Sequence, residues 1–193
     1  MAFVTTPVWI TLVVQLEPLH INPPIWRRLV VNGDSSLRKL HHFIQASMGW
    51  SSQHLHEFTV GDNTYAPPDL DPSLSMSLDD RKLKLFKLKA GDRLRYLYDL
   101  GDSWQHVIAV EKVEKAPQAG TFCEVLGGER ACPPEDIGGM PGYLDLLERI
   151  RTQPYSAETR ERLLDLGGDF DPELFDWRAA NAAVQRICNN LWG

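Results

Sequence analysis

The sequence predicts an α+β fold in which an antiparallel or mixed β-sheet carries one helix near residues 36–48 and a helical segment at the C-terminal end. Three patterns lead to this prediction. Aromatic and apolar residues alternate on both sides of a Gly-Asp turn near 93–113, as they do in a β-hairpin. Apolar residues recur at helical spacing over 36–48. Helical spacing returns in several stretches between about 141 and 192.

The predicted hairpin near 93–113 is the element around which the chain is organised. Its first strand carries Tyr96 and Tyr98 on one face, and its second strand begins at Trp104. Between the strands, Gly101 can supply a positive φ, and the neighbouring aspartates can accept hydrogen bonds from the backbone of the turn. Several ionisable side chains therefore fall close to one turn.

The N-terminal part of the chain is expected to supply further strands and the first helix. Residues 8–16 and 25–31 are rich in β-branched and aromatic residues and are predicted to be strands. The helix over 36–48 has a glycine just past its end, where a left-handed residue commonly ends a helix. A short hairpin is expected over 58–65, followed by a Pro-, Asp- and Ser-rich loop over 66–78.

The remaining elements follow the hairpin, apart from one ambiguous stretch before it. Residues 82–89 fit a strand or a helix equally well, whereas 122–126 favour a strand. A long Gly- and Pro-rich loop then leads to a helix whose first turn suits Pro141. Further helices are expected over 156–166 and from Asp176 onward.

Composition indicates an ordinary globular protein. The 193 residues suit about one domain over 1–193, with a core from about 9 to 187 and a C-terminal helical part from about 141 to 192. Three cysteines without a C-x-x-C pair suit a reducing compartment. The N-terminus does not resemble a signal peptide, and the apolar runs are far shorter than the ~20 residues of a membrane span. We therefore expect a soluble, cytoplasmic protein with no membrane contact.

Charge is distributed unevenly along the chain. The formal net charge of −6 argues against a surface built as a whole for nucleic acid. Residues 81–95 nevertheless contain seven Lys/Arg and one Asp, a balance of +6, whereas residues 132–176 contain eleven Asp/Glu and four Arg, a balance of −7. Lys84 and Lys87 are candidates for binding an anionic partner. The alternative is a solvated amphipathic element, which is the commoner meaning of a charge run.

Two of the six histidines lie two residues apart. On a strand, His54 and His56 would share a face, which is a geometry that a metal ion can use. A polar strand edge is the alternative interpretation. His41 lies beside the apolar stripe of the first helix, where a histidine is more often a hydrogen-bonded packing residue than a ligand.

Three blocks of the sequence resemble a known family. The first is Y-L-Y-D-L-G-D-S-W-Q-H over 96–106, with Glu111 following. The second is C-P-P-E-D-I-G-G-M-P-G-Y over 132–143, and the third is F-D-P-E-L-F-D over 170–176. They are similar to blocks of the plasmid pRiA4b ORF-3-like proteins, some of which are passenger proteins of insertion elements. The resemblance covers about 9–187.

The resemblance implies an α+β fold on an antiparallel sheet and a mobile-element or accessory-genome origin, but it does not imply an activity. Leu100 stands where the family commonly has Phe, which is a mild apolar change. Ile137 stands where the family often has Cys, so a thiol at that place is not essential to this protein.

If the hairpin turn and the Pro-Pro-Glu-Asp loop meet, carboxylates, an imidazole and aromatic rings would gather in one place. The alternative is that these polar residues fix turns and cap backbone amides. The candidate catalytic residues are Asp102, His106, Glu135 and Asp136; the candidate binding residues are Tyr98, Asp99, Trp104, Tyr143, Lys84 and Lys87; the candidate metal ligands are His54, His56, His106 and Cys132.

Two hypotheses about function follow. The first is a non-catalytic interaction module that contacts a protein or a nucleic acid through the sheet and the basic segment 81–95. The second is a small metal-dependent or acid–base hydrolase that uses the neighbourhood of Asp102, His106 and Glu135. We favour the module, because the sequence contains no P-loop, no G-x-G-x-x-G after a strand, no H-E-x-x-H and no G-x-S-x-G. No cofactor is predicted, although a divalent metal ion is compatible with the candidate ligands.

Overall fold

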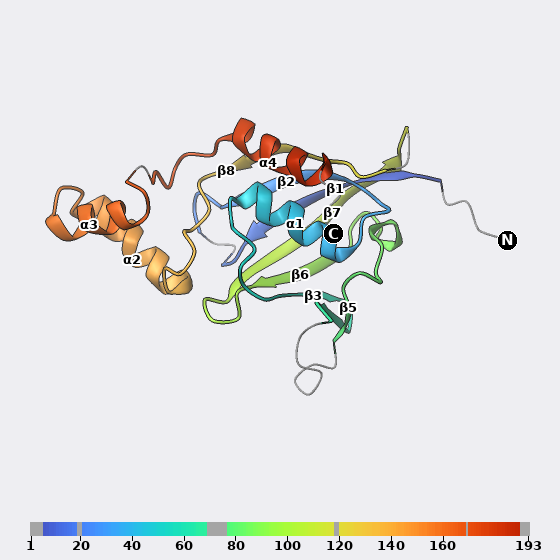
Figure 1. Ribbon diagram of the computed structural model, residues 1–193, viewed down its shortest axis with the longest axis horizontal. Helices are drawn as coiled ribbons and strands as arrows, with labels where there is room; N and C mark the ends of the chain where they lie inside the picture. Colours follow the sequence, from blue (N-terminus) through green and yellow to red (C-terminus); the bar gives the residue numbers. More distant parts are fainter. Residues whose placement is uncertain (1–5, 19–20, 69–76, 118–119, 169, 190–193) are drawn as a thin grey trace.

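The protein is a mixed β-sheet with its first and last helices over one face and its other two helices at one end, seen in a computed structural model (Figure 1). This confirms the predicted α+β class. The structure describes residues 6–18, 21–68, 77–117, 120–168 and 170–189.

Eight strands of the described chain form one sheet in the order β5-β4-β3-β6-β7-β1-β2-β8. Neighbouring strands are antiparallel, except that β4 and β5 are parallel. The strands are β1 (Val8–Leu16), β2 (Trp26–Asn32), β3 (His56–Val60), β4 (Asn63–Ala66), β5 (Leu78–Asp79), β6 (Arg93–Tyr98), β7 (Trp104–Lys115) and β8 (Cys123–Glu129).

The helices divide into two groups. The first and last helices lie side by side over the sheet, whereas the two between them lie together at one end of the molecule (Figure 1). The helical elements are α1 (Leu37–Met48), the short 3-10 helix η1 (Leu85–Lys87), α2 (Gly139–Thr152), α3 (Ala157–Asp165) and α4 (Trp177–Asn189). None of the described helices is long and apolar enough to cross a membrane.

The central hairpin is confirmed. Tyr98 pairs with Trp104, and the register continues to Arg93 opposite Ala109. Period-two patterning buries one face of β6, with Tyr96 and Tyr98 almost fully covered. The other edge of β7 pairs with the whole length of β1, which places the hairpin in the middle of the sheet.

The turn between β6 and β7 differs from the prediction in one respect. Gly101 does not adopt a positive φ; Asp99 at 57° and Ser103 at 55° do so instead. The Asp99 side chain makes this possible, because its Oδ1 accepts hydrogen bonds from the amides of Gly101 at 2.9 Å and Asp102 at 3.3 Å. The expectation that an aspartate bonds to the turn backbone is therefore confirmed.

Helix α1 ends as the sequence predicts and begins one residue later than predicted. The Ser36 side chain caps the amide of Lys39, and Gly49 ends the helix at φ 92°. The apolar stripe of α1 is fully buried between the helix and the sheet. His41 also points inward, where its Nδ1 lies 2.8 Å from the Tyr96 hydroxyl. His41 is thus the hydrogen-bonded packing residue that its position indicated.

Helix α4 packs against α1 and along β8, the last strand of the sheet. The Asn181 side chain bonds to both backbone groups of Val125, accepting from the amide at 2.9 Å and donating to the carbonyl at 2.9 Å. The Gln185 side chain donates to the Cys123 carbonyl at 2.9 Å. Ala180 and Val184 lie on the buried face of α4. Polar and apolar contacts together fix α4 on the sheet.

The ambiguous stretch 82–89 forms neither a strand nor an α-helix. It is an irregular segment around η1, because Leu85 and Leu88 are buried three residues apart and hold one tight turn. The predicted loop 66–78 falls partly on residues 69–76, which lie outside the described residues. The long loop expected before Pro141 is shorter than predicted, since β8 continues to Glu129 and α2 begins at Gly139.

Candidate functional site

The hairpin turn and the Pro-Glu-Asp loop lie against each other. The Tyr98 hydroxyl donates to Glu135 Oε1 at 2.5 Å, while the amide and the hydroxyl of Ser51 donate to Glu135 Oε2 at 2.9 and 2.6 Å. The Gly138 amide donates to Asp102 Oδ2 at 3.2 Å. Glu135 and Asp102 therefore fasten the loop to the hairpin from two sides. We call this contact region the junction.

The backbone at the junction is unusually constrained. Of the five described non-glycine residues with positive φ, four lie here, and such conformations persist only where the surroundings enforce them. Gly139 also has a positive φ, and a Cβ there would come within 2.4 Å of the Asp102 carbonyl oxygen. The loop and the turn therefore meet at backbone distance. The four residues are Ser52, Asp99, Ser103 and Asp136.

His106 does not join Asp102 and Glu135. It is 1% exposed on the inner face of the sheet, with its ring against Trp50 and Tyr96. Neither ring nitrogen has a hydrogen-bond partner among the described residues, and burial lowers the pKa of His106 to about 4. The three residues of the hydrolase hypothesis therefore make separate contacts instead of one shared catalytic arrangement.

Two other candidate residues belong to the interior, and Cys132 is partly buried. Trp104 and Tyr143 are buried core residues, and their Nε1 and hydroxyl groups have no partner among the described residues. The Cys132 thiol lies near Arg27, and burial raises its pKa to about 12. A thiol in that state is a poor nucleophile and a poor metal ligand at neutral pH.

His54 and His56 have different surroundings, so the predicted shared face is not formed. Strand β3 begins at His56, and His54 lies in the preceding loop. His54 Nε2 is 3.4 Å from Asp136 Oδ1 and 3.7 Å from Asp99 Oδ2. These three residues each offer a ligand atom within 4.8 Å of the others, which makes them a candidate metal-binding group at the junction. They were predicted as candidates separately, for three different roles.

His56 instead enters a buried polar network that the sequence did not reveal. Its Nε2 lies 3.0 Å from Asp80 Oδ2, and Arg38 Nε donates to the same oxygen at 2.8 Å. Its ring stacks on His41 with centroids 3.6 Å apart. Burial is the main cause that lowers the pKa values of both histidines. The network joins α1, β3 and the segment after β5.

The basic candidates lie away from the junction, at the other end of α1. Lys84 forms an isolated bridge with Ser36, the residue that caps the N-terminus of α1. The junction begins beyond the C-terminus of α1, where Trp50 stacks on Tyr98. Lys84 and Lys87 are both exposed. The candidate binding residues therefore form two groups rather than one.

A hollow of about 250 Å³ lies beside the basic segment. Hydroxyl and amine side chains dominate its lining, with one carboxylate. The lining residues are Asp34, Ser35, Ser36, Lys39, Lys84, Gly120 and Thr121.

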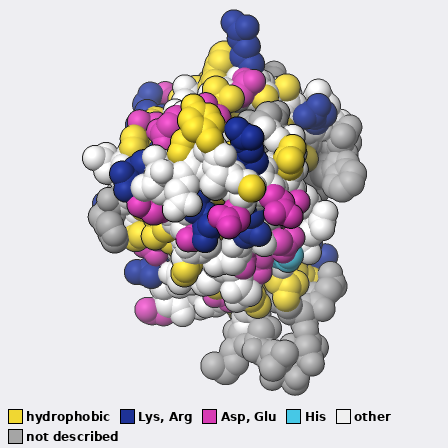
Figure 2. Space-filling model, turned by 90° about the vertical axis from the view of Figure 1, so that its left-hand side faces the viewer, with side chains coloured by type: hydrophobic (Ala, Val, Ile, Leu, Met, Phe, Trp, Pro, Cys, Tyr) yellow, Lys and Arg dark blue, Asp and Glu magenta, His cyan; other side chains and the backbone are white. Residues whose placement is uncertain are grey.

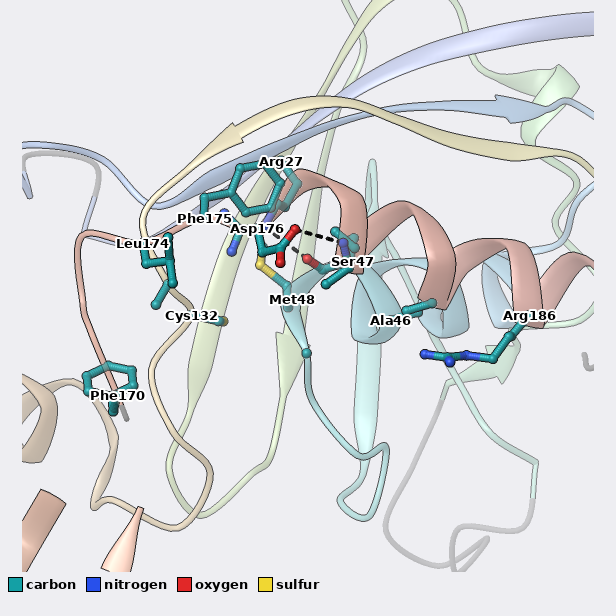
Figure 3. A pocket seen from close by; sticks show the side chains of 15 residues that line it. Arg27, Ala46, Ser47, Met48, Cys132, Phe170, Leu174, Phe175, Asp176 and Arg186 are labelled. Carbon is teal, nitrogen blue, oxygen red and sulfur yellow. Dashed lines mark hydrogen bonds between the residues drawn. The ribbon is translucent and has the colours of Figure 1, made fainter. Parts of the chain in front are cut away.

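A larger cavity of about 390 Å³ lies between α4, the end of α1 and the segment before α4 (Figure 3). Arg27 lies at its inner end, only 2% exposed, with its guanidinium 4.1 Å from the centre of the Phe175 ring. Apolar side chains, including Leu174 and Phe170, form one wall, and Arg186 reaches toward the cavity from α4 (Figure 3). In the sequence, Arg27 is one of two adjacent arginines within the predicted strand 25–31, and nothing there indicates that it is buried.

Arg27 is satisfied by backbone carbonyls rather than by a carboxylate. Its guanidinium donates to the carbonyl oxygens of Ser47 at 3.0 Å and Arg130 at 2.9 Å, both buried. Two further bonds reach the carbonyls of Trp26 and Glu129. Burial lowers the pKa of Arg27, and the four carbonyl dipoles compensate for the lost hydration. This side chain ties β2, α1 and the end of β8 together.

The acidic stretch 132–176 does not form one negative face. On the end of the molecule that carries α2 and α3, acidic and basic side chains are interspersed (Figure 2). Arg149 pairs with Asp145 and Arg151 with Glu148 within α2. These exposed pairs neutralise part of the local charge.

The fold and the junction define an α+β protein whose central hairpin turn is fastened to an acidic, glycine-rich loop. The chain belongs to the plasmid pRiA4b ORF-3-like protein family, whose model matches residues 9–179. It is 34% identical over 173 residues to the "Uncharacterized protein y4hQ" of Sinorhizobium fredii, covering 87% of each chain. A crystal structure described as a protein of unknown function, MM3350 from Methanosarcina mazei Go1, is similar with a TM-score of 0.79.

That structure shares 31% sequence identity, and the match covers 91% of this chain and 97% of the other. The family resemblance seen in the sequence is therefore confirmed. The names of these relatives state no activity, so they support neither the interaction module nor the hydrolase.

Proposed function

We propose that this protein is a non-catalytic binding module that holds the phosphate backbone of a nucleic acid on the segment around η1. The observation that carries the proposal is four exposed lysines on one short, anchored segment of a chain whose net charge is −6. We call this segment the lysine turn. Its lysines are Lys82, Lys84, Lys87 and Lys89.

The lysine turn is held rigidly on the body of the protein. Leu85 and Leu88 are buried, so the lysines between and around them point outward. The Leu85 amide donates to the Ser35 carbonyl at 2.9 Å, and the Phe86 amide donates to the Gly33 carbonyl at 2.8 Å. A fixed backbone presents the four charges together, which lowers the ordering cost of binding.

These lysines are available to a partner. Among the described residues, none of the four has a carboxylate within the 4.0 Å of an ion pair, whereas Lys112 pairs with Glu114 at 2.7 Å. Unpaired, exposed ammonium groups are the side chains that neutralise phosphates and release counterions. The acidic remainder of the chain would repel a polyanion elsewhere and confine it to this segment.

The adjoining hollow supports a phosphate as the bound group. Its lining supplies the hydroxyls of Ser35, Ser36 and Thr121 and the amines of Lys39 and Lys84. Hydroxyl and ammonium groups are donors to phosphate oxygens. The helix amides contribute less, because the first amides of α1 already bond to the segment before η1 and to Ser36.

An exposed aromatic ring favours a nucleic acid over other polyanions. Phe86 is 37% exposed and lies within the lysine turn itself. Aromatic rings set among cationic side chains stack on bases, and such stacking contributes about 1–3 kcal/mol per base. A polymer that carries both phosphates and bases fits this surface better than an acidic peptide does.

The test is fluorescence anisotropy of the full chain with a labelled oligonucleotide, single-stranded and double-stranded, across a salt series. The double variant Lys84→Glu/Lys87→Glu should weaken binding and reduce the salt slope by about one for each lysine that contacts a phosphate. The matched control is Arg160→Glu/Arg162→Glu, which makes the same charge change on α3 at the far end of the molecule (Figure 1). The control should bind like the wild type.

Two results would contradict a role of the lysine turn in binding. One is the absence of saturable, salt-dependent binding to either oligonucleotide at low salt. The other is an equal loss in both double variants, which would indicate net charge alone and no role for the lysine turn. Equal affinity for polyglutamate would show that the segment binds any polyanion, and it would overturn the choice of nucleic acid.

A further inference from the structure

We infer that His54, Asp99 and Asp136 form a binding site for a divalent transition-metal ion at the junction. This inference is independent of the proposed nucleic-acid binding, because the junction and the lysine turn lie at opposite ends of α1. The site lies where the hairpin turn contacts the loop before α2, and these two segments belong to the first two sequence blocks that resemble the family.

The spacing of the three ligand atoms suits one ion. His54 Nε2 lies 3.4 Å from Asp136 Oδ1 and 3.7 Å from Asp99 Oδ2, and all three ligand atoms lie within 4.8 Å of one another. Metal–nitrogen and metal–oxygen bonds to zinc are about 2.0–2.2 Å. Two ligands of one ion are therefore separated by about 3.0–4.2 Å, depending on the angle between the bonds. Small side-chain rotations bring all three atoms into that range.

Asp99 is positioned as a metal ligand usually is. The residue is 8% exposed, and its Oδ1 is held by the two amides of the turn. The other oxygen, Oδ2, accepts no hydrogen bond from the described residues and faces His54. This oxygen therefore remains available to a cation on the side that faces His54. Hydrogen bonds that orient a ligand from behind are the common support of metal sites.

The other two ligands come from segments that are fixed relative to Asp99. Asp136 follows Glu135, which is bonded to both Tyr98 and Ser51. His54 lies with its ring edge toward Tyr98, the centroids being 5.9 Å apart. Three separate segments therefore supply one ligand each. Acidic side chains and a histidine are visible together at this end of the molecule (Figure 2).

The chemistry of the ligands selects a class of ion. One imidazole and two carboxylates suit Zn²⁺, Co²⁺ or Mn²⁺, whereas Ca²⁺ and Mg²⁺ prefer oxygen ligands alone and Cu⁺ prefers sulfur. The Asp136 side chain is 78% exposed and that of His54 is 30% exposed, so the site opens to solvent on one side. Water would complete the coordination, and the ion would link the loop, the turn and the segment before β3.

The experiment titrates Zn²⁺ into the full chain after treatment with a chelator, with heat of binding as the first readout. Co²⁺ serves as a spectroscopic probe of the ligands. We expect one ion per chain. Asp136→Asn and His54→Gln should each weaken binding at least about tenfold, since even supporting residues of metal sites have effects of that size. Asparagine tolerates the left-handed backbone that position 136 requires.

Matched controls keep the interpretation specific. Asp62→Asn changes an exposed aspartate in the β3–β4 turn, and His42→Gln changes a partly exposed histidine on α1. Both should bind Zn²⁺ like the wild type. Zn²⁺ should also raise the melting temperature of the wild type and of the controls, but not that of Asp136→Asn or His54→Gln.

The inference fails if the wild type shows no saturable binding of Zn²⁺ or Co²⁺, or if Asp136→Asn binds as tightly as the wild type. It also fails if the controls lose as much affinity as the site variants. Asp99→Asn is informative only where the variant folds, because Asp99 also shapes the turn. Asp136→Asn and His54→Gln decide the question without it, since both residues are on the surface of the junction.

Discussion

The bond between Tyr98 and Glu135 should contribute measurably to the stability of the junction. Tyr98→Phe removes only the hydroxyl that donates to Glu135 Oε1 at 2.5 Å. Hydrogen bonds to a charged group contribute about 1.5–3 kcal/mol, and Glu135 keeps its two bonds from Ser51. We therefore expect the lower part of that range, a loss of about 2 kcal/mol in the free energy of unfolding. For a chain of this size, that corresponds to a melting temperature lower by about 4–8 °C.

The assay is urea unfolding followed by circular dichroism, arranged as a double-mutant cycle with Glu135→Gln. If the two side chains act through one bond, the double variant should lose less than the sum of the single variants. The difference is the coupling energy, which we expect to be about 1 kcal/mol or more for residues in direct contact.

Tyr65→Phe is the matched control, because Tyr65 is also buried but its hydroxyl has no hydrogen bond with the described residues. It should change stability by less than about 0.5 kcal/mol. The reasoning would be refuted if Tyr98→Phe were as mild as Tyr65→Phe, or if the coupling energy with Glu135→Gln were zero. Either outcome would mean that the turn and the loop do not depend on this bond.

Two further predictions concern buried charged or titratable groups. Burial lowers the pKa of His106 from 6.5 to about 4, so the unfolded chain binds its proton first as pH falls. His106 therefore lowers the free energy of unfolding progressively from pH 6.5 down to about 4, by on the order of 3 kcal/mol. In unfolding titrations, His106→Leu should lose less stability than the wild type over that pH window. An unchanged pH slope would contradict this prediction. Arg27→Met should lower the free energy of unfolding by about 3 kcal/mol or more, because two buried carbonyls lose a charged donor. Arg28→Met breaks an exposed pair with Glu111 and should lower it by less than about 1 kcal/mol in the same urea assay.

Elements that depend on local pattern could be predicted from the sequence. Strand β1 has the predicted bounds, because alternation and β-branched residues act within the strand itself. Helix α1 was predicted to within a residue, since its apolar stripe and its closing glycine are local signals. The family resemblance then indicated that these separate elements belong to one α+β fold.

The conformation of the hairpin turn could not be predicted from residue preferences. Glycine adopts a positive φ most easily, yet Asp99 and Ser103 adopt it here. The Asp99 carboxylate compensates for this strain by accepting two amides of the turn. The loop that carries Gly138 then presses on the turn from outside. A local side-chain contact, supported from outside by the loop, therefore accompanies the positive φ of Asp99 and Ser103, and residue preferences alone do not predict it.

The grouping of candidate residues also depended on distant contacts. His54 and His56 are close in the sequence, but His54 lies near Asp136 at the junction, whereas His56 contacts Asp80 in the buried network. Arg27 could not be recognised as a buried residue, because its carbonyl partners come from α1 and from the end of β8. Such surroundings are assembled only by the fold, and no pattern along the chain encodes them directly.

The way α4 lies on β8 determines where another chain can attach. An outermost strand normally offers unpaired amides and carbonyls, which invite a strand from a second molecule and so lead to aggregation or peptide capture. Here the carboxamide of Asn181 occupies both backbone groups of Val125, and Gln185 occupies the carbonyl of Cys123. The helix thus acts as a substitute neighbour for the strand. Growth of the sheet by strand addition is blocked on this side, and the short β5 forms the opposite border.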